Sequence, residues 1–85
     1  MKFMVEVRIR LKKGMLNPEA ATIERALALL GYEVEDTDTT DVITFTMDED
    51  SLEAVEREVE DMCQRLLCNP VIHDYDVSIN EMSSH

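Results

Sequence analysis

The stretch FMVEVRIRL, residues 3–11, decides the fold, because an apolar side chain stands at every second position and Met4, Glu6, Arg8 and Arg10 stand between them. A period of two residues predicts a β-strand with one face in the core and the other in solvent. The apolar side consists of Phe3, Val5, Val7, Ile9 and Leu11. The rest of the chain is interpreted around this strand.

A helix is expected directly after this strand. Lys13 and Gly14 break the alternation, and Asn17-Pro18-Glu19 then provides a capping residue, a proline at the first helical position and an acid in the first turn. The helix should run to Leu30, where Gly31 provides a left-handed stop. Its inward stripe is predicted to be Ala20, Ile23, Leu27 and Leu30.

The second half of the chain repeats strands and a helix. Two strands are predicted at 33–38 and 42–47, joined by a hairpin at 39–41. Asp50 and Glu53 form a capping box for a longer helix, which Asn69-Pro70 ends. The apolar seam of that helix is predicted to be Leu52, Val55, Val59, Met62 and Leu66. A last strand alternates through Tyr75, Val77 and Ile79.

The element order β-α-β-β-α-β predicts an α+β, ferredoxin-like fold, in which two helices cover one face of a four-stranded antiparallel sheet. Residues 1–80 form this single domain, and 81–85 are expected to be a flexible C-terminal tail. The last strand should lie beside the first. Asp74 and Asp76 would then face Arg8 and Arg10 on the uncovered side of the sheet.

The charge of the chain restricts its partners. The net charge is −11, so phosphate backbones and anionic membrane surfaces would mostly be repelled. No run of apolar residues reaches the length of a membrane span, and no signal peptide is recognised. Cys63 and Cys68, five residues apart on one predicted helix, should point to different faces. Reduced thiols and a cytoplasmic location are therefore expected.

No catalytic, cofactor-binding or metal-binding residues emerge from the sequence. No nucleophile has an adjacent base, and His73 has no cysteine or carboxylate at zinc-ligand spacing. Predicted outward positions of the central strands carry no aromatic side chains for stacking RNA bases. One alternative stays open, a free-standing regulatory module that binds a small metabolite between protomers. Such modules usually have a glycine-rich turn after the first strand, where this chain has only Gly14.

Three segments carry a family resemblance. They are KKGMLNPE (residues 12–19), LLGYE (29–33) and MCQRLLCNPVIHDY (62–75). Together they resemble the PurS subunit of phosphoribosylformylglycinamidine synthase, which shows a K-x-G-V-L-D/N-P turn, an L-G-Y helix end and a C-x-x-L-L-x-N-P-V-I-x-D-Y block. The chain departs from this family at residues 35–41. There the family commonly has a basic V-R-x-G-K element, whereas this chain is acidic.

The resemblance implies a non-catalytic small subunit of an ATP-dependent ligase of purine biosynthesis. A PurL-type synthetase would bind ATP and magnesium, and a PurQ-type glutaminase would release ammonia from glutamine. The small subunit would assist assembly and ammonia transfer, and would itself form dimers or tetramers through the open sheet face or a sheet edge. The partner-contact candidates are Lys12, Gly14, Leu16, Asn17, Pro18, Asn69 and Pro70.

Overall fold

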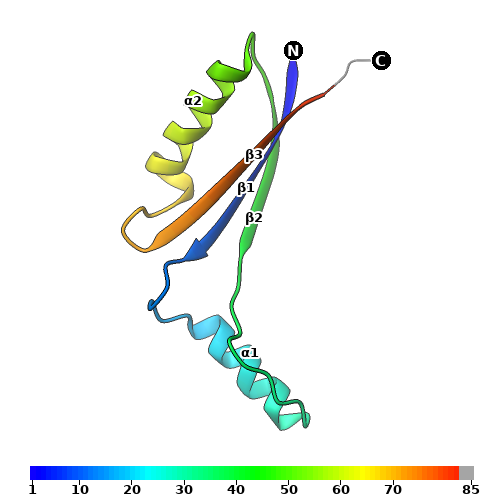
Figure 1. Ribbon diagram of the computed structural model, residues 1–85, viewed down its shortest axis with the longest axis vertical. Coiled ribbons are helices and arrows are strands. Elements are labelled where there is room, and N and C mark those ends of the chain that lie inside the picture. Colours follow the sequence, from blue (N-terminus) through cyan, green and yellow to red (C-terminus); the bar gives the residue numbers. More distant parts are fainter. Residues whose placement is uncertain (83–85) are drawn as a thin grey trace.

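The computed structural model describes residues 1–82 and contains three strands, two α-helices and one π-helical turn (Figure 1). In chain order the elements are β1 (Lys2–Leu11), α1 (Pro18–Leu29), β2 (Asp41–Asp48), α2 (Leu52–Met62), the π turn (Cys63–Leu67) and β3 (His73–Met82). All strands join one antiparallel sheet with the order β2-β1-β3. The last strand therefore lies beside the first, as expected.

The central strand β1 has the two-sided character that its alternation predicts. Val5 lies opposite Phe45 and Ile79 in the register of the sheet, so three apolar side chains share one face. Phe3, Val5, Val7 and Ile9 are buried on this face, and the residues between them are exposed or half-buried. The rest of the buried core consists of Val55, Val59, Cys63 and Cys68 from α2 and the segment after it.

Helix α2 covers the apolar face of the sheet, but its cap differs from the prediction. Ser51, not Asp50, is the N-cap, and its hydroxyl accepts a hydrogen bond from the backbone N–H of Ala54 at 3.2 Å. Serine and aspartate cap helices about equally well, so the sequence alone could not choose between neighbours. The helix consequently begins at Leu52.

The prediction of a four-stranded sheet is wrong, because residues 33–38 form no strand. This segment leaves the far tip of α1 and runs back to β2 (Figure 1). Asp36 adopts a left-handed backbone conformation with φ of 55°, which breaks an extended strand. Acidic residues at 33, 35, 36 and 38 also disfavour pairing. The fold is therefore a three-stranded sheet with two helices.

The prediction that both helices cover the sheet is also wrong. Helix α1 lies beyond one end of the sheet (Figure 1), and Ala20 is its single buried residue. The radius of gyration is 16.9 Å, with extents of 52 × 33 × 15 Å. A compact domain of this length would have a radius near ~12 Å. The chain is thus a thin, open structure rather than a closed globule.

The π turn corrects the prediction for the two cysteines. The backbone N–H of Cys68 donates to the carbonyl of Cys63 at 3.0 Å, five residues back. The wider turn brings positions five apart onto one face, so both thiols are buried in the core instead of pointing to different sides. Burial, with the neighbouring Cys68 thiol, raises the pKa of Cys63 to about 11.

The π turn also ends the predicted apolar seam of the second helix early. Val55 and Val59 are buried and Met62 is half-buried, as that seam requires, but Leu66 is 84% exposed. At the C-terminus, β3 continues through Met82, so the first two residues of the expected tail belong to the strand. The remaining expected tail residues, 83–85, lie outside the described part of the chain. No helix within residues 1–82 has the length and apolar character needed to cross a membrane.

Candidate docking surface

Two loops that the sequence marks as contact candidates meet at one end of the sheet. The backbone N–H of Lys12 donates to the carbonyl of Ile72 at 2.8 Å, which extends the pairing of β1 and β3 beyond the strands. The Lys12 ammonium lies 3.4 Å from the carboxylate of Asp74. We call the two loops, residues 12–18 and 69–72, the docking end.

The first loop of the docking end presents an apolar side chain to solvent. Met15 N–H donates to the carbonyl of Lys12 at 3.1 Å, which closes a tight turn. Gly14 in this turn has φ of 91°, a conformation that costs a residue with a side chain. Leu16 follows the turn and is 90% exposed. The glycine therefore shapes the loop, and the leucine is the side chain available for contact.

Asn17 and Pro18 have structural roles at the start of α1 that the sequence only partly predicted. The Asn17 side chain accepts a hydrogen bond from Ala20 N–H at 3.0 Å, which confirms it as the cap of α1. Its amide also donates to Asp38 at 3.0 Å and to the Thr39 hydroxyl at 2.9 Å. Asn17 thereby fastens the start of α1 to the segment that enters β2. Nothing in the local spacing of the sequence predicted this contact across the chain.

The second loop of the docking end is held by Asn69. Its carbonyl accepts hydrogen bonds from Ile72 N–H at 3.0 Å and His73 N–H at 2.8 Å, and its side-chain oxygen accepts one from Val71 N–H at 3.1 Å. His73 accepts a hydrogen bond at Nδ1 from Asn69 N–H at 2.9 Å. The closed turn leaves Val71 75% exposed. Sequence reasoning missed Val71 as a contact candidate, although it lies beside Pro70.

The open face of the sheet beside the docking end carries paired charges. Arg10 lies 3.4 Å from Asp76, and Lys12 pairs with Asp74. The expected pairing of opposite charges between β1 and β3 is therefore present, although Arg8 bonds to Glu6 on its own strand at 3.0 Å. These groups, together with Pro70, line a shallow hollow of about 400 Å³. Exposed pairs of this kind contribute little to stability.

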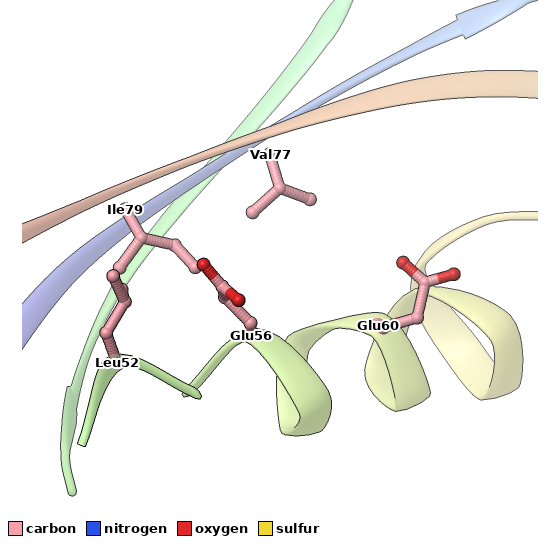
Figure 2. Close-up of a pocket in the computed structure, with 5 residues that line it drawn as sticks. All are labelled: Leu52, Glu56, Glu60, Val77 and Ile79. Atoms are coloured by element: carbon pink, nitrogen blue, oxygen red, sulfur yellow. The ribbon is translucent and has the colours of Figure 1, made fainter. Parts of the chain in front are cut away.

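A second hollow, of about 300 Å³, lies between α2 and β3, and Figure 2 shows its lining. Val77 and Ile79 come from β3, whereas Leu52, Glu56 and Glu60 come from α2. Next to it, the Tyr75 hydroxyl donates to Glu60 at 2.6 Å, and Gln64 donates to the Tyr75 oxygen at 3.0 Å. The bond to Glu60 raises the pKa of Tyr75, with a smaller contribution from burial. These groups bond one another and tie α2 to β3.

Neither a metal-binding cluster nor a reactive thiol is found within residues 1–82. Within residues 1–82, no three or more His, Cys, Asp or Glu side chains are grouped so that they could hold a metal ion. The thiols of Cys63 and Cys68 are buried and their pKa values are raised, chiefly by burial. A protonated, buried thiol is a weak nucleophile. The exposed apolar side chains of the docking end therefore form a candidate protein-contact surface.

These features define a class: an open, thin α+β domain with apolar side chains exposed at one end, which suits contact with other proteins. Residues 4–81 match the PurS family, described as phosphoribosylformylglycinamidine (FGAM) synthase. The chain belongs to this family. The chain is also 46% identical over 81 residues to the phosphoribosylformylglycinamidine synthase subunit PurS of Methanocaldococcus jannaschii, covering 94% of this chain and 98% of that protein.

Solved structures show the same architecture. The crystal structure of the M. jannaschii PurS, one of the subunits of formylglycinamide ribonucleotide amidotransferase, matches with a TM-score of 0.83, 45% identity, and coverage of 95% of this chain and 99% of that one. A chain in the structure of PurLQS from Thermotoga maritima matches with a TM-score of 0.84 at 25% identity, covering 94% and 99%. The three-stranded open arrangement is therefore the PurS fold.

Proposed function

We propose that this chain is the small, non-catalytic subunit of a phosphoribosylformylglycinamidine synthase and acts in purine biosynthesis. Its partners would be a PurL-type synthetase, which would hold the ATP and Mg²⁺, and a PurQ-type glutaminase. The similarity to a chain of the T. maritima PurLQS structure supports these partners. In this proposal the complex acts in the cytoplasm, which suits a chain whose two cysteines are free thiols.

One observation carries the proposal at the level of residues: the docking end joins both family-typical loops in one surface. The hydrogen bond from Lys12 to Ile72 fixes the loops side by side, and Leu16 and Val71 project from them into solvent. Such exposed leucine and valine side chains lose unfavourable hydration when a partner covers them. We therefore place the contact with the larger subunits at the docking end.

A subunit of this kind can assist catalysis without a reacting group. Ammonia in neutral water is mostly protonated to ammonium, which has no lone pair with which to attack a carbon. A sealed route between glutaminase and synthetase keeps the nucleophile out of water and unprotonated. In the proposed complex, the thin sheet of this chain helps to close that route by holding the two larger subunits together.

Self-association is part of the proposal. A domain of 85 residues with a thickness of 15 Å buries little of its apolar surface, as the exposed Leu16, Leu30 and Leu66 illustrate. Small domains often gain the missing stability by oligomerising. We propose that the chain forms dimers or dimers of dimers.

The test is reconstitution with the synthetase and glutaminase of the same organism. Glutamine-dependent formation of the amidine product should require this chain, whereas turnover with added ammonium salt should depend on it far less. Leu16→Asp and Val71→Asp should lower glutamine-dependent turnover and co-elution together. Leu29→Asp, an exposed leucine far from the docking end, is the matched control. Equal glutamine-dependent turnover with and without the chain would refute the assignment.

A further inference from the structure

Two buried thiols, those of Cys63 and Cys68, have no part in the proposed function. Cys63 is completely buried and Cys68 is 8% exposed, and both are free. The π turn brings them onto one face of the chain, where the backbone N–H of Cys68 donates to the carbonyl of Cys63 at 3.0 Å. The two side chains also lie close enough to share a hydrogen bond. They therefore form a pair within a single chain.

The two thiols of this pair differ in acidity. Burial raises the pKa of Cys63 to about 11, and the neighbouring Cys68 adds to this effect. Burial also raises the pKa of Cys68, but there the hydrogen bond with the Cys63 thiol has the opposite effect. Cys68 therefore gives up its proton more readily than Cys63. Because the thiolate is the nucleophile in disulfide exchange, Cys68 is the better attacking group.

Cys68 also lies in a part of the chain that opens easily. Among residues 64–72 it is the single buried residue, and the others are exposed or half-buried. Opening of this stretch therefore uncovers little apolar surface and needs less free energy than unfolding of the sheet. Cys63 belongs to the core cluster that contains Val55 and Val59, so it stays packed. While the stretch is closed, both thiols are protonated, buried and unreactive.

The second cysteine is not part of the family pattern. The block C-x-x-L-L-x-N-P has a cysteine at the position of Cys63 and leaves the position of Cys68 free. A single thiol at Cys63 could form no link within the chain, whereas two neighbouring thiols can be joined by oxidation. The pair is thus a property of this chain beyond what membership of the family implies.

We propose that Cys63 and Cys68 are a reversible disulfide site, which a small-molecule disulfide oxidises when residues 64–72 open. In the first step the Cys68 thiol releases its proton to water, and its sulfur attacks one sulfur of the small disulfide, whose S–S bond breaks. The departing thiolate takes up a proton. In the second step Cys63 loses its proton and attacks the Cys68 sulfur, and the second small thiolate leaves and is protonated. Two protein thiols are thereby oxidised, and one small disulfide is reduced to two thiols.

The disulfide would restrain the loop that follows it. It closes the loop of residues 63–68 and keeps Cys68 in the core, so residues 64–72 no longer open. Asn69 follows Cys68 directly and holds the second loop of the docking end through its hydrogen bonds. Oxidation therefore fixes the position of this loop, and a reducing dithiol releases it. Cytosolic disulfides of this reversible kind are usually transient and redox-sensing.

The first experiment exposes the purified full chain to oxidised glutathione. Both thiols should disappear together, and peptide mapping should find Cys63 joined to Cys68 in a chain that is not linked to other chains. Reduced dithiothreitol should restore both thiols. Two free thiols after the treatment, glutathione retained on one of them, or a disulfide between two chains would each overturn the proposal.

The second experiment tests whether local opening exposes Cys68. The rate of oxidation should change by less than about twofold at urea concentrations below the unfolding transition, because opening residues 64–72 uncovers little surface. Oxidation through global unfolding would instead accelerate steeply with urea. A rate that rises in proportion to the unfolded fraction contradicts the proposed site.

The third experiment identifies the attacking thiol. With oxidised glutathione, Cys63→Ala should form a mixed disulfide at Cys68, whereas Cys68→Ala should react at least about tenfold more slowly. Circular dichroism checks that both variants fold. In the wild-type chain, which needs no substitution, a limiting amount of iodoacetamide should label Cys68 before Cys63. Labelling of Cys63 first would refute the proposed order of the two steps.

Hydrogen exchange measures the restraint on the docking end. In the oxidised chain the backbone N–H groups of residues 68–72 should exchange at least about tenfold more slowly than in the reduced chain, with β1 unchanged. Equal exchange in the two forms would refute the restraint. None of these measurements involves the synthetase or the glutaminase, and reconstitution uses the reduced chain. The disulfide site and the proposed function can therefore fail separately.

Discussion

The two α-helices of this chain are of nearly equal length but have opposite relations to the sheet. Helix α2 buries Val55 and Val59 against β1, whereas α1 buries Ala20 alone and stands beyond the end of the sheet. One helix thus belongs to the core of its own chain, and the other presents its apolar side outward. The comparison teaches that an amphipathic pattern predicts an apolar helix face, but not whether the sheet of the same chain covers that face.

The largest expected effect distinguishes the two helices by their contribution to folding. Val55→Asp places a charge in the core without a partner, so we expect the free energy of unfolding to fall by more than about 4 kcal/mol. Ile23→Asp should cost less than about 1 kcal/mol, because its side chain already contacts water. Urea denaturation, at concentrations where both chains sediment as monomers, measures the two values. Similar losses at the two positions would remove the distinction.

The next expected effect is on the pH dependence of folding stability. It arises in the half of the chain that contains α2 and both thiols. The Cys63 thiol ionises near its ordinary pKa of 9.0 when unfolded and near 11 when folded, so the folded state holds its proton more tightly. The resulting stability is complete below pH 9 and is lost as the pH rises through about 11. The loss should be at most roughly 3 kcal/mol.

Comparison with Cys63→Ala isolates the contribution of this thiol from every other cause of the pH dependence. The variant should be less stable near neutral pH because it leaves a cavity, but its stability should fall less steeply between pH 9 and 11. Parallel pH profiles for the two proteins would show that the thiol does not cause the loss.

A smaller loss of stability is expected when the N-cap of either helix is removed. Asn17→Ala removes the cap of α1 and the bonds to Asp38 and Thr39, and should cost about 1–2 kcal/mol. Ser51→Ala removes one cap bond from α2 and should cost about 1 kcal/mol. Hydrogen exchange should show faster exchange confined to α1 and residues 32–40 in the first variant. Faster exchange in the sheet of Asn17→Ala would mean that α1 is part of the cooperative core.

The smallest effect on stability is expected at the docking end. Lys12→Ala removes an exposed ion pair with Asp74, so the free energy of unfolding should change by less than about 0.5 kcal/mol. Co-elution with the synthetase should weaken nonetheless, if the docking end makes the proposed contact. Thermal unfolding and co-elution are measured on the same preparation, and a variant that is destabilised as much as it loses binding would point to a folding role.

The sequence predicted well wherever local pattern and local packing agree. The alternation of residues 3–11 identified β1 and its buried face. The Asn17-Pro18 start of α1 and the pairing of β3 with β1 were also confirmed. In each case the deciding interaction involves residues close in sequence, or a strand order common to this topology.

The prediction was wrong where contacts between residues far apart in the sequence determine the structure. A stripe of Ala20, Ile23, Leu27 and Leu30 implied a helix on the sheet, but Asn17 and its contacts with residues 38 and 39 direct α1 elsewhere. The π turn adds one residue to a helical turn, which changes the face of every later side chain and brings Cys68 to Cys63. The docking end was predicted as two separate loops; that the bond between Lys12 and Ile72 joins them was visible only in three dimensions.

The position of β1 between its two neighbours limits how the sheet can grow. Both hydrogen-bonding edges of β1 are occupied, so within the described chain only the outer edges of β2 and β3 could accept another strand. A strand added by another polypeptide would extend the sheet at one edge without contacting β1. The charged side chains on the open face of β1, Glu6, Arg8 and Arg10, would then keep the same neighbours however many chains assemble. The electrostatic character of that face would therefore not change with assembly.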